Sequence, residues 1–158
     1  FLGQPVYSFA LVLGGLLTAS GLGSFISRNR SRAQVQLLFL ILLLLLVVFF
    51  WKMPEWLAGL SGEGWTSRLL WSWLLVGTAG LLMGIPFPSG LRFFRVFDVH
   101  GEERRIKVAL AWGSNACASV AGAAGALWIA QLAGQSWLFL LGAVAYGTAL
   151  LILVFREA

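Results

Sequence analysis

The residues best equipped for chemistry gather around His100, the only histidine of the chain. Asp98, Glu102 and Glu103 lie next to it, so metal binding or acid–base catalysis is the chemistry to consider. One imidazole and a few carboxylates, on a charged segment without a defined scaffold, do not make such a site. We interpret this segment as a solvated loop, and the sequence predicts no catalytic residue, no metal ligand and no cofactor.

Two further features fail the same test. Cys117 is the single cysteine, so neither a disulfide framework nor a Cys/His zinc site can be built from it. Gly122 and Gly125 lie among alanines with no strand before them, whereas a phosphate cradle needs a glycine loop between a strand and a helix N-terminus. We therefore predict no nucleotide site.

Asn115 is the most polar position inside an apolar stretch, and Ser114 and Ser119 lie near it. An amide in hydrocarbon needs hydrogen-bond partners. The interpretation we favour is an interhelical hydrogen bond. A role in ligand binding is the alternative, for which the sequence offers no second polar group that converges on Asn115.

The elements that must position these residues are membrane-spanning helices. Of the 158 residues, 59% are hydrophobic and 11% are charged, and the mean hydropathy is +0.89, far from the balance of a soluble domain. A bilayer core about 30 Å thick needs about 20 apolar residues per helix. The sequence predicts an all-α, polytopic membrane helical bundle that forms one domain of about five transmembrane helices, over residues 5–26, 35–53, 69–85, 108–132 and 137–155.

Charged residues and prolines set the limits of these spans. Three arginines between residues 28 and 32 close the first span, and Pro86 and Pro88 end the third. Residues 54–60 are too short to cross a membrane and are predicted to lie in the interface. All acidic and basic residues lie in loops or at span ends, which argues against a self-sufficient ion-coupled transporter.

The basic residues also predict an orientation. The net charge of +5 is interpreted as a topology signal and not as a nucleic-acid surface. Nine Lys and Arg fall on one side of the predicted spans: Arg28, Arg30, Arg32, Arg92, Arg95, Arg104, Arg105, Lys107 and Arg156. Only Lys52 and Arg68 fall on the other, where seven of the eight tryptophans also cluster, Trp112 being the exception. We expect residue 1 on the outer side and the C-terminus in the cytoplasm, in a bacterial inner membrane.

Small residues recur every four positions in three of the spans. Such ridges allow a neighbouring helix to approach closely, and packing within the chain is favoured over a dedicated dimer face. The predicted packing residues are Gly15, Ala19 and Gly23 in the first span, Gly80 and Gly84 in the third, and Ser114, Ala118, Gly122 and Ala126 in the fourth.

Three stretches together carry a resemblance. They are residues 1–8 leading into 21–24, residues 84–92 with Pro86, Pro88, Gly90 and Arg92, and residues 111–116 with Trp112 and Asn115. In this order they resemble the C-terminal membrane region of spermidine-synthase-like membrane proteins. Ser89 departs from the pattern, in which a larger apolar residue is common, and residues 93–110 do not follow it.

The resemblance implies that the chain is part of a longer protein. It implies an aminopropyltransferase-type domain before Phe1, which would bind an adenosylmethionine-like donor, and none of that domain's site residues falls in this chain. The prolines and Gly90 are expected to form an elbow after the third span, and Arg92 to reach lipid phosphates.

We therefore expect a noncatalytic membrane anchor or scaffold domain. The alternatives are an accessory subunit of a larger membrane assembly, such as an energy-converting complex, and part of a transporter. The expected partners are the lipid bilayer and other transmembrane helices, of the same protein or of a complex, and no nucleic acid. The basic residues Arg104, Arg105 and Lys107 are expected to attract anionic lipid headgroups.

Overall fold

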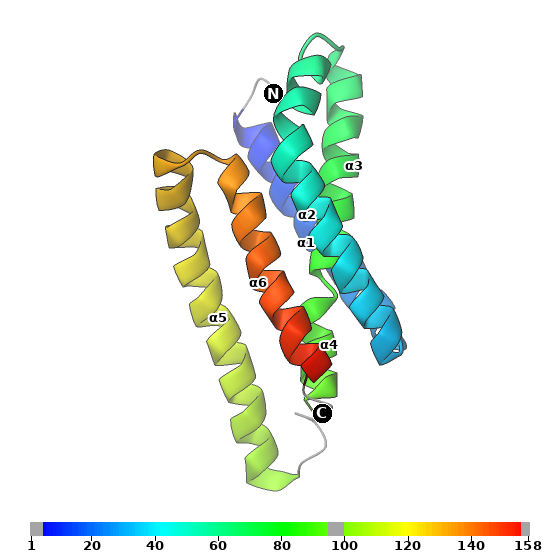
Figure 1. The fold of residues 1–158 in the computed structure, drawn as a ribbon, viewed down its shortest axis with the longest axis vertical. Helices are drawn as coiled ribbons and strands as arrows, with labels where there is room; N and C mark the ends of the chain where they lie inside the picture. Colours follow the sequence, from blue (N-terminus) through cyan, green and yellow to red (C-terminus); the bar gives the residue numbers. More distant parts are fainter. Residues whose placement is uncertain (1–4, 95–99, 156–158) are drawn as a thin grey trace.

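The computed structural model describes residues 5–94 and 100–155, and these residues form an all-α bundle (Figure 1). Its helices are α1 (Pro5–Ser27), α2 (Arg32–Leu60), α3 (Trp65–Met83), α4 (Pro86–Phe93), α5 (Gly101–Leu132) and α6 (Ser136–Phe155). Five helical stretches are long and apolar enough to cross a membrane, with α3 and α4 together providing one of them. The predicted fold class is confirmed.

Local sequence explains where the helices begin and end. Ser31 and Gln34 form a capping box that starts α2, since the Ser31 hydroxyl accepts from the Gln34 amide and the Gln34 side chain accepts from the Ser31 amide. Pro86 occupies the first turn of α4, where its missing N–H costs nothing. After α5 the chain turns through Gly134, whose φ of +97° favours glycine.

Helix α2 is longer than the sequence predicted. It does not end near Met53 but continues through Pro54 to Leu60, so residues 54–60 extend the same helix. The Lys52 ammonium and the Glu55 carboxylate, one turn apart, lie 2.8 Å from each other beside the proline. Likewise α5 begins at Gly101, so the charged residues before position 108 are helical.

Helix α2 lies at the centre of the bundle. Its buried residues are spaced alternately four and three apart, as in the seam of a coiled coil: Val35, Phe39, Leu42, Leu46 and Phe49. The first four of these residues form one cluster with Leu82 and Ile85 and with Ala143 and Leu153 of α6. The main core of the molecule therefore runs along one face of α2.

Helices α1 and α3 form a second, tighter contact. The buried residues of α1 recur every four positions, namely Leu11, Gly15, Ala19, Gly23 and Ser27. A Cβ atom added to Gly23 would overlap the carbonyl oxygen of Leu81, and one added to Gly84 would overlap that of Ser20. The two backbones touch at these glycines, which is the packing expected of a small-residue ridge in a membrane.

Helix α5 lies at the edge of the bundle beside α6 (Figure 1). It has no buried residue. Of its predicted packing ridge, Ser114 and Ala118 border a cavity described below, whereas nothing lies within 4 Å of a Cβ added to Gly122. Most of the surface of this helix is thus not covered by other described parts of the chain.

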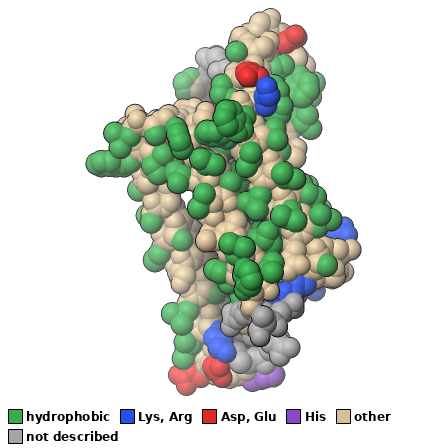
Figure 2. Space-filling model, in the orientation of Figure 1, with side chains coloured by type: hydrophobic (Ala, Val, Ile, Leu, Met, Phe, Trp, Pro, Cys, Tyr) green, Lys and Arg blue, Asp and Glu red, His purple; other side chains and the backbone are tan. Residues whose placement is uncertain are grey.

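The helices alternate in direction, so their ends divide into two sets (Figure 1). The α2–α3 and α5–α6 turns lie at the upper end, and the start of α5 and the end of α6 lie at the lower end. Figure 2 shows green hydrophobic side chains distributed along the visible face, with charged side chains in its upper and lower parts. This distribution is the one that a membrane-embedded bundle requires.

Candidate functional site

The proline-containing stretch forms the junction between α3 and α4. Helix α3 stops at Met83, Gly84 and Ile85 interrupt it, and Pro86 opens the short helix α4. Gly90 lies inside α4 and its backbone is helical, so the turn expected at this glycine is not present. The interruption therefore comes from the two residues before Pro86.

Arg92 binds the end of α1. Its guanidinium donates through Nη1 to the carbonyl oxygen of Arg28 and through Nη2, at 2.6 Å, to that of Arg30. Both carbonyls follow the last helical residue of α1, where no helical amide remains to donate to them. Arg92, which was expected to reach lipid phosphates, thus also forms a C-terminal cap on a neighbouring helix.

Arg32 makes a similar connection at the start of α2. Its Nη2 donates to the carbonyl oxygen of Leu153, in the last turn of α6. The ring of Phe93 lies between the two arginines, with its centroid 4.5 Å from the Arg92 guanidinium carbon and 5.8 Å from that of Arg32. Two arginines and one phenylalanine thereby join the ends of α1, α2, α4 and α6.

A cavity of about 590 Å³ lies among α2, α4, α5 and α6, and we call it the motif cavity. It brings together residues of two stretches that are separate in the sequence, Pro86 and Gly90 on one side and Ser114 and Asn115 on the other. Trp112 is not among its lining residues, but its ring meets that of Phe87 edge to face at 5.1 Å. The second and third stretches of the resemblance therefore meet at one place.

Polar groups converge in the motif cavity. Ser89 is 2% exposed and its Oγ has no hydrogen-bond partner among the described residues. Ser114, Asn115 and Tyr146 also line the cavity. The sequence singled out Asn115 but offered no second group beside it. The one available signal was Ser89, a hydroxyl at a position where the resembled pattern has a larger apolar side chain.

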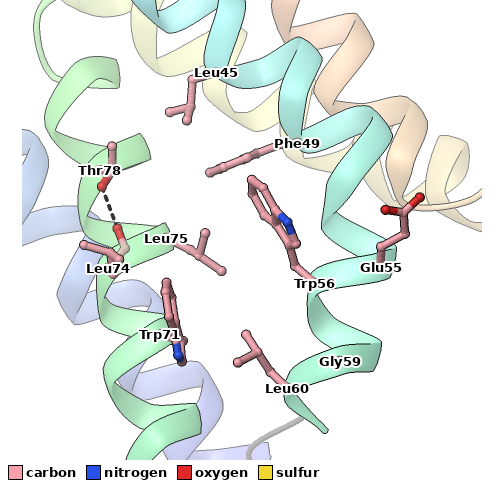
Figure 3. Close-up of a pocket in the computed structure, with 10 residues that line it drawn as sticks. All are labelled: Leu45, Phe49, Glu55, Trp56, Gly59, Leu60, Trp71, Leu74, Leu75 and Thr78. Carbon is pink, nitrogen blue, oxygen red and sulfur yellow. Dashed lines mark hydrogen bonds between the residues drawn. The ribbon is translucent and has the colours of Figure 1, made fainter.

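A second opening lies between α2 and α3, near the end that carries most of the tryptophans. Figure 3 shows Phe49 and Trp56 of α2 facing Leu75 and Trp71 of α3 across this cleft of about 680 Å³. Its Thr78 hydroxyl already donates to the carbonyl oxygen of Leu74 at 2.7 Å. Glu55, at one side of the cleft, pairs with Lys52. The lining therefore offers apolar surface but little to orient a ligand.

The residues near His100 do not form a site within the described parts of the chain. His100 is exposed and directly precedes α5, where its side chain makes no capping hydrogen bond. Glu103 pairs with Lys107 at 2.8 Å, along the exposed side of that helix. Asp98, Arg95, Arg156 and the first four residues lie outside the described ranges. Over residues 5–94 and 100–155, no three His, Cys, Asp or Glu side chains cluster as metal ligands would.

Comparisons with known proteins do not identify this site. No family model, no curated protein and no solved structure matches the chain. The site must therefore be interpreted from its own residues.

Proposed function

We propose that the chain is a membrane-embedded anchor or scaffold domain that performs no chemistry itself. The observation that carries this proposal is the combination of five potential spans with internal contacts made by glycine backbones and by arginine caps. Large apolar side chains such as Leu44, Trp73 and Val120 are exposed on its helices, and a lipid environment would cover them.

The resemblance supports placing this domain in a spermidine-synthase-like membrane protein. In such a protein the helices would hold an aminopropyltransferase-type domain at the membrane surface. The convergence of the second and third stretches on one cavity supports the idea that they belong together. Polyamine synthesis would then be the activity of the whole protein and not of this chain.

A second candidate is an accessory subunit of a larger membrane assembly. Helix α5 favours it, because this long helix has no buried residue and its small-residue ridge is uncovered around Gly122. A helix of another subunit would pack well on such a surface. For either candidate we propose the orientation predicted from the basic residues, with the lower end of Figure 1 in the cytoplasm of a bacterial cell.

Two observations separate the candidates. The coding sequence before Phe1 should contain an aminopropyltransferase-type domain if the first is correct, and replacing residues 1–158 by an unrelated membrane anchor should leave aminopropyl transfer by the purified protein unchanged. Stoichiometric copurification with other membrane subunits after mild detergent extraction would favour the second. Loss of aminopropyl transfer in the replacement protein would contradict a purely noncatalytic anchor.

A further inference from the structure

We propose that the motif cavity is a binding site for a neutral, lipid-soluble molecule that carries a carbonyl or hydroxyl group. The proposal does not depend on whether the chain is an anchor or a subunit. It rests on one buried hydroxyl that has no partner among the described residues, on the polar groups that line the same space, and on the lack of charged side chains among the described residues of the lining.

Ser89 is the central observation. Three hydroxyls on the other helices are satisfied locally, as Thr18, Ser72 and Ser119 each donate to the carbonyl oxygen four residues earlier. Ser89 is more deeply buried than these residues, yet its Oγ makes no such bond. Burying an unpaired hydroxyl is unfavourable, so a hydrogen-bonding group of a ligand in the cavity would remove that cost.

Asn115 and Ser114 line the cavity from α5, whereas Ser89 lines it from α4. Tyr146 of α6 adds a phenolic hydroxyl. An amide supplies both a donor and an acceptor, and a hydroxyl can act as either. A carbonyl or hydroxyl oxygen placed among these groups could bond to more than one of them at once.

The other described residues of the lining carry no charge and are mostly apolar. Among the described residues that line the cavity, Tyr146 alone is ionisable, so a charged ligand would lose its hydration without gaining an ion pair from them. Phe39, Phe87 and Leu91 contribute apolar surface. The volume falls within the range of about 300–1,000 Å³ that is usual for small-molecule sites. A neutral polar group on an apolar body fits these conditions.

The cavity also lies at a depth that such a molecule can reach. Asn115 is about 10 Å along the α5 axis from Val108, where the apolar part of that helix begins, at a rise of 1.5 Å per residue. Neutral amphiphiles partition into this part of a bilayer, whereas ions are costly there.

The test uses the full chain in detergent micelles and two photoreactive probes of equal chain length, a fatty alcohol and a fatty acid that each carry a diazirine. We expect the alcohol to label peptides of α4 and α5, and the fatty acid, at a pH at which its carboxyl group is ionised, to label them at least about fivefold less, because the carboxylate would lose its hydration without gaining an ion pair. Equal labelling by the two probes would indicate unspecific filling by acyl chains and would overturn the proposal.

Variants locate the site. Ser89→Ala and Asn115→Leu should each reduce labelling by the alcohol about fivefold, and Ala118→Phe should block it by filling the cavity. Without ligand, Ser89→Ala should unfold at an unchanged or higher temperature, because it removes a buried hydroxyl that has no partner.

Ser27→Ala is the matched control. Ser27 is also buried, but its hydroxyl donates to the carbonyl oxygen of Ser24 at 2.7 Å, and it lies on α1 outside the motif cavity. This variant should unfold at a lower temperature and keep wild-type labelling. The reverse pattern, with Ser89→Ala destabilised and still labelled, would show that Ser89 has only a structural role.

Discussion

Glycine is the residue type on which the α1–α3 contact depends. Gly23 and Gly84 each lie so near to a backbone carbonyl of the facing helix that an added Cβ atom would come within 2.8 Å and 2.7 Å of the carbonyl carbons of Leu81 and Ser20, respectively. These atoms belong to backbone and cannot rotate away as the end of a side chain can. The two helices would have to separate to admit a methyl group.

Substitution by alanine should destabilise the protein at these two glycines but not at glycines with open space around them. We expect Gly23→Ala and Gly84→Ala each to lower the free energy of unfolding by about 1–3 kcal/mol or more, because both overpack a helix contact. Thermal unfolding in detergent micelles is the measurement. Gly21→Ala and Gly77→Ala, on the same two helices but with nothing within 4 Å, should be neutral or stabilising by up to about 1 kcal/mol.

Arg92 should not be replaceable by lysine. A guanidinium donates to the carbonyls of Arg28 and Arg30 through two nitrogens at once, and an ammonium cannot reproduce that fork. Since water reaches these bonds, we expect Arg92→Lys to cost only about 1 kcal/mol of unfolding free energy.

The control for this prediction is Arg105→Lys, at an exposed position on α5, which should have no measurable effect on unfolding. Equal stability of the wild type and the Arg92→Lys variant would mean that charge alone, and not the double cap, is needed at this position.

At the level of helices, the sequence predicted which segments are apolar but not where each helix ends. Hydropathy predicted five spans, and five helical stretches are long and apolar enough to cross a membrane. It could not show that α2 continues past Pro54, because the residue pattern for a helix that tolerates a proline near its end resembles that for one that stops there. Composition also could not show that the charged segment at the start of α5 is helical, because polar helices and polar loops have similar compositions.

The sequence also could not predict the motif cavity. Asn115 could be recognised from its type, but its neighbours Ser89 and Tyr146 lie 26 and 31 positions away, on other helices. Which faces of α4, α5 and α6 meet depends on how the helices rotate and pack, and hydropathy carries little information about rotation in a membrane, where every face is apolar.

Helix α5 has a side that no other described residue covers around Gly122. Gly122 faces open space, whereas a Cβ at Gly80 would lie 3.1 Å from the Ala19 Cβ and 3.2 Å from the Leu16 Cα. We expect Gly122→Leu to change the unfolding free energy of the isolated chain by no more than about 0.5 kcal/mol, and Gly80→Leu to destabilise it strongly.

The same pair of variants tests for a partner helix. If α5 packs on another subunit, Gly122→Leu should reduce copurification of that subunit while the stability of the isolated chain stays unchanged. A marked loss of stability in isolated Gly122→Leu would instead mean that this side of α5 packs within the chain.

For the whole molecule, the two ends of the bundle differ in their charged and aromatic residues. The α1–α2 turn and the start of α5 carry most of the arginines, whereas the α2–α3 turn and the α5–α6 turn lie near the tryptophans at the other end (Figures 1 and 2). Arginines at the first of these ends also cap α1 and α6. The arginines from which we propose the orientation thus also hold the helices to one another.

This arrangement predicts which turn faces which side of the membrane. In a Cys117→Ala background, which removes the only cysteine, a single cysteine is introduced by Asn29→Cys or by Gly62→Cys, both at exposed positions in turns. A membrane-impermeant maleimide added to intact cells should label the Gly62→Cys variant, and the Asn29→Cys variant only after the membrane is opened. Labelling of both in intact cells would mean that the chain inserts in two orientations, and labelling of Asn29→Cys alone would reverse the assignment.

Three arginines adjoin the α1–α2 turn, whereas only Lys52 and Arg68 lie near the α2–α3 turn. Replacing those three arginines by glutamine should therefore increase labelling of the Asn29→Cys variant in intact cells.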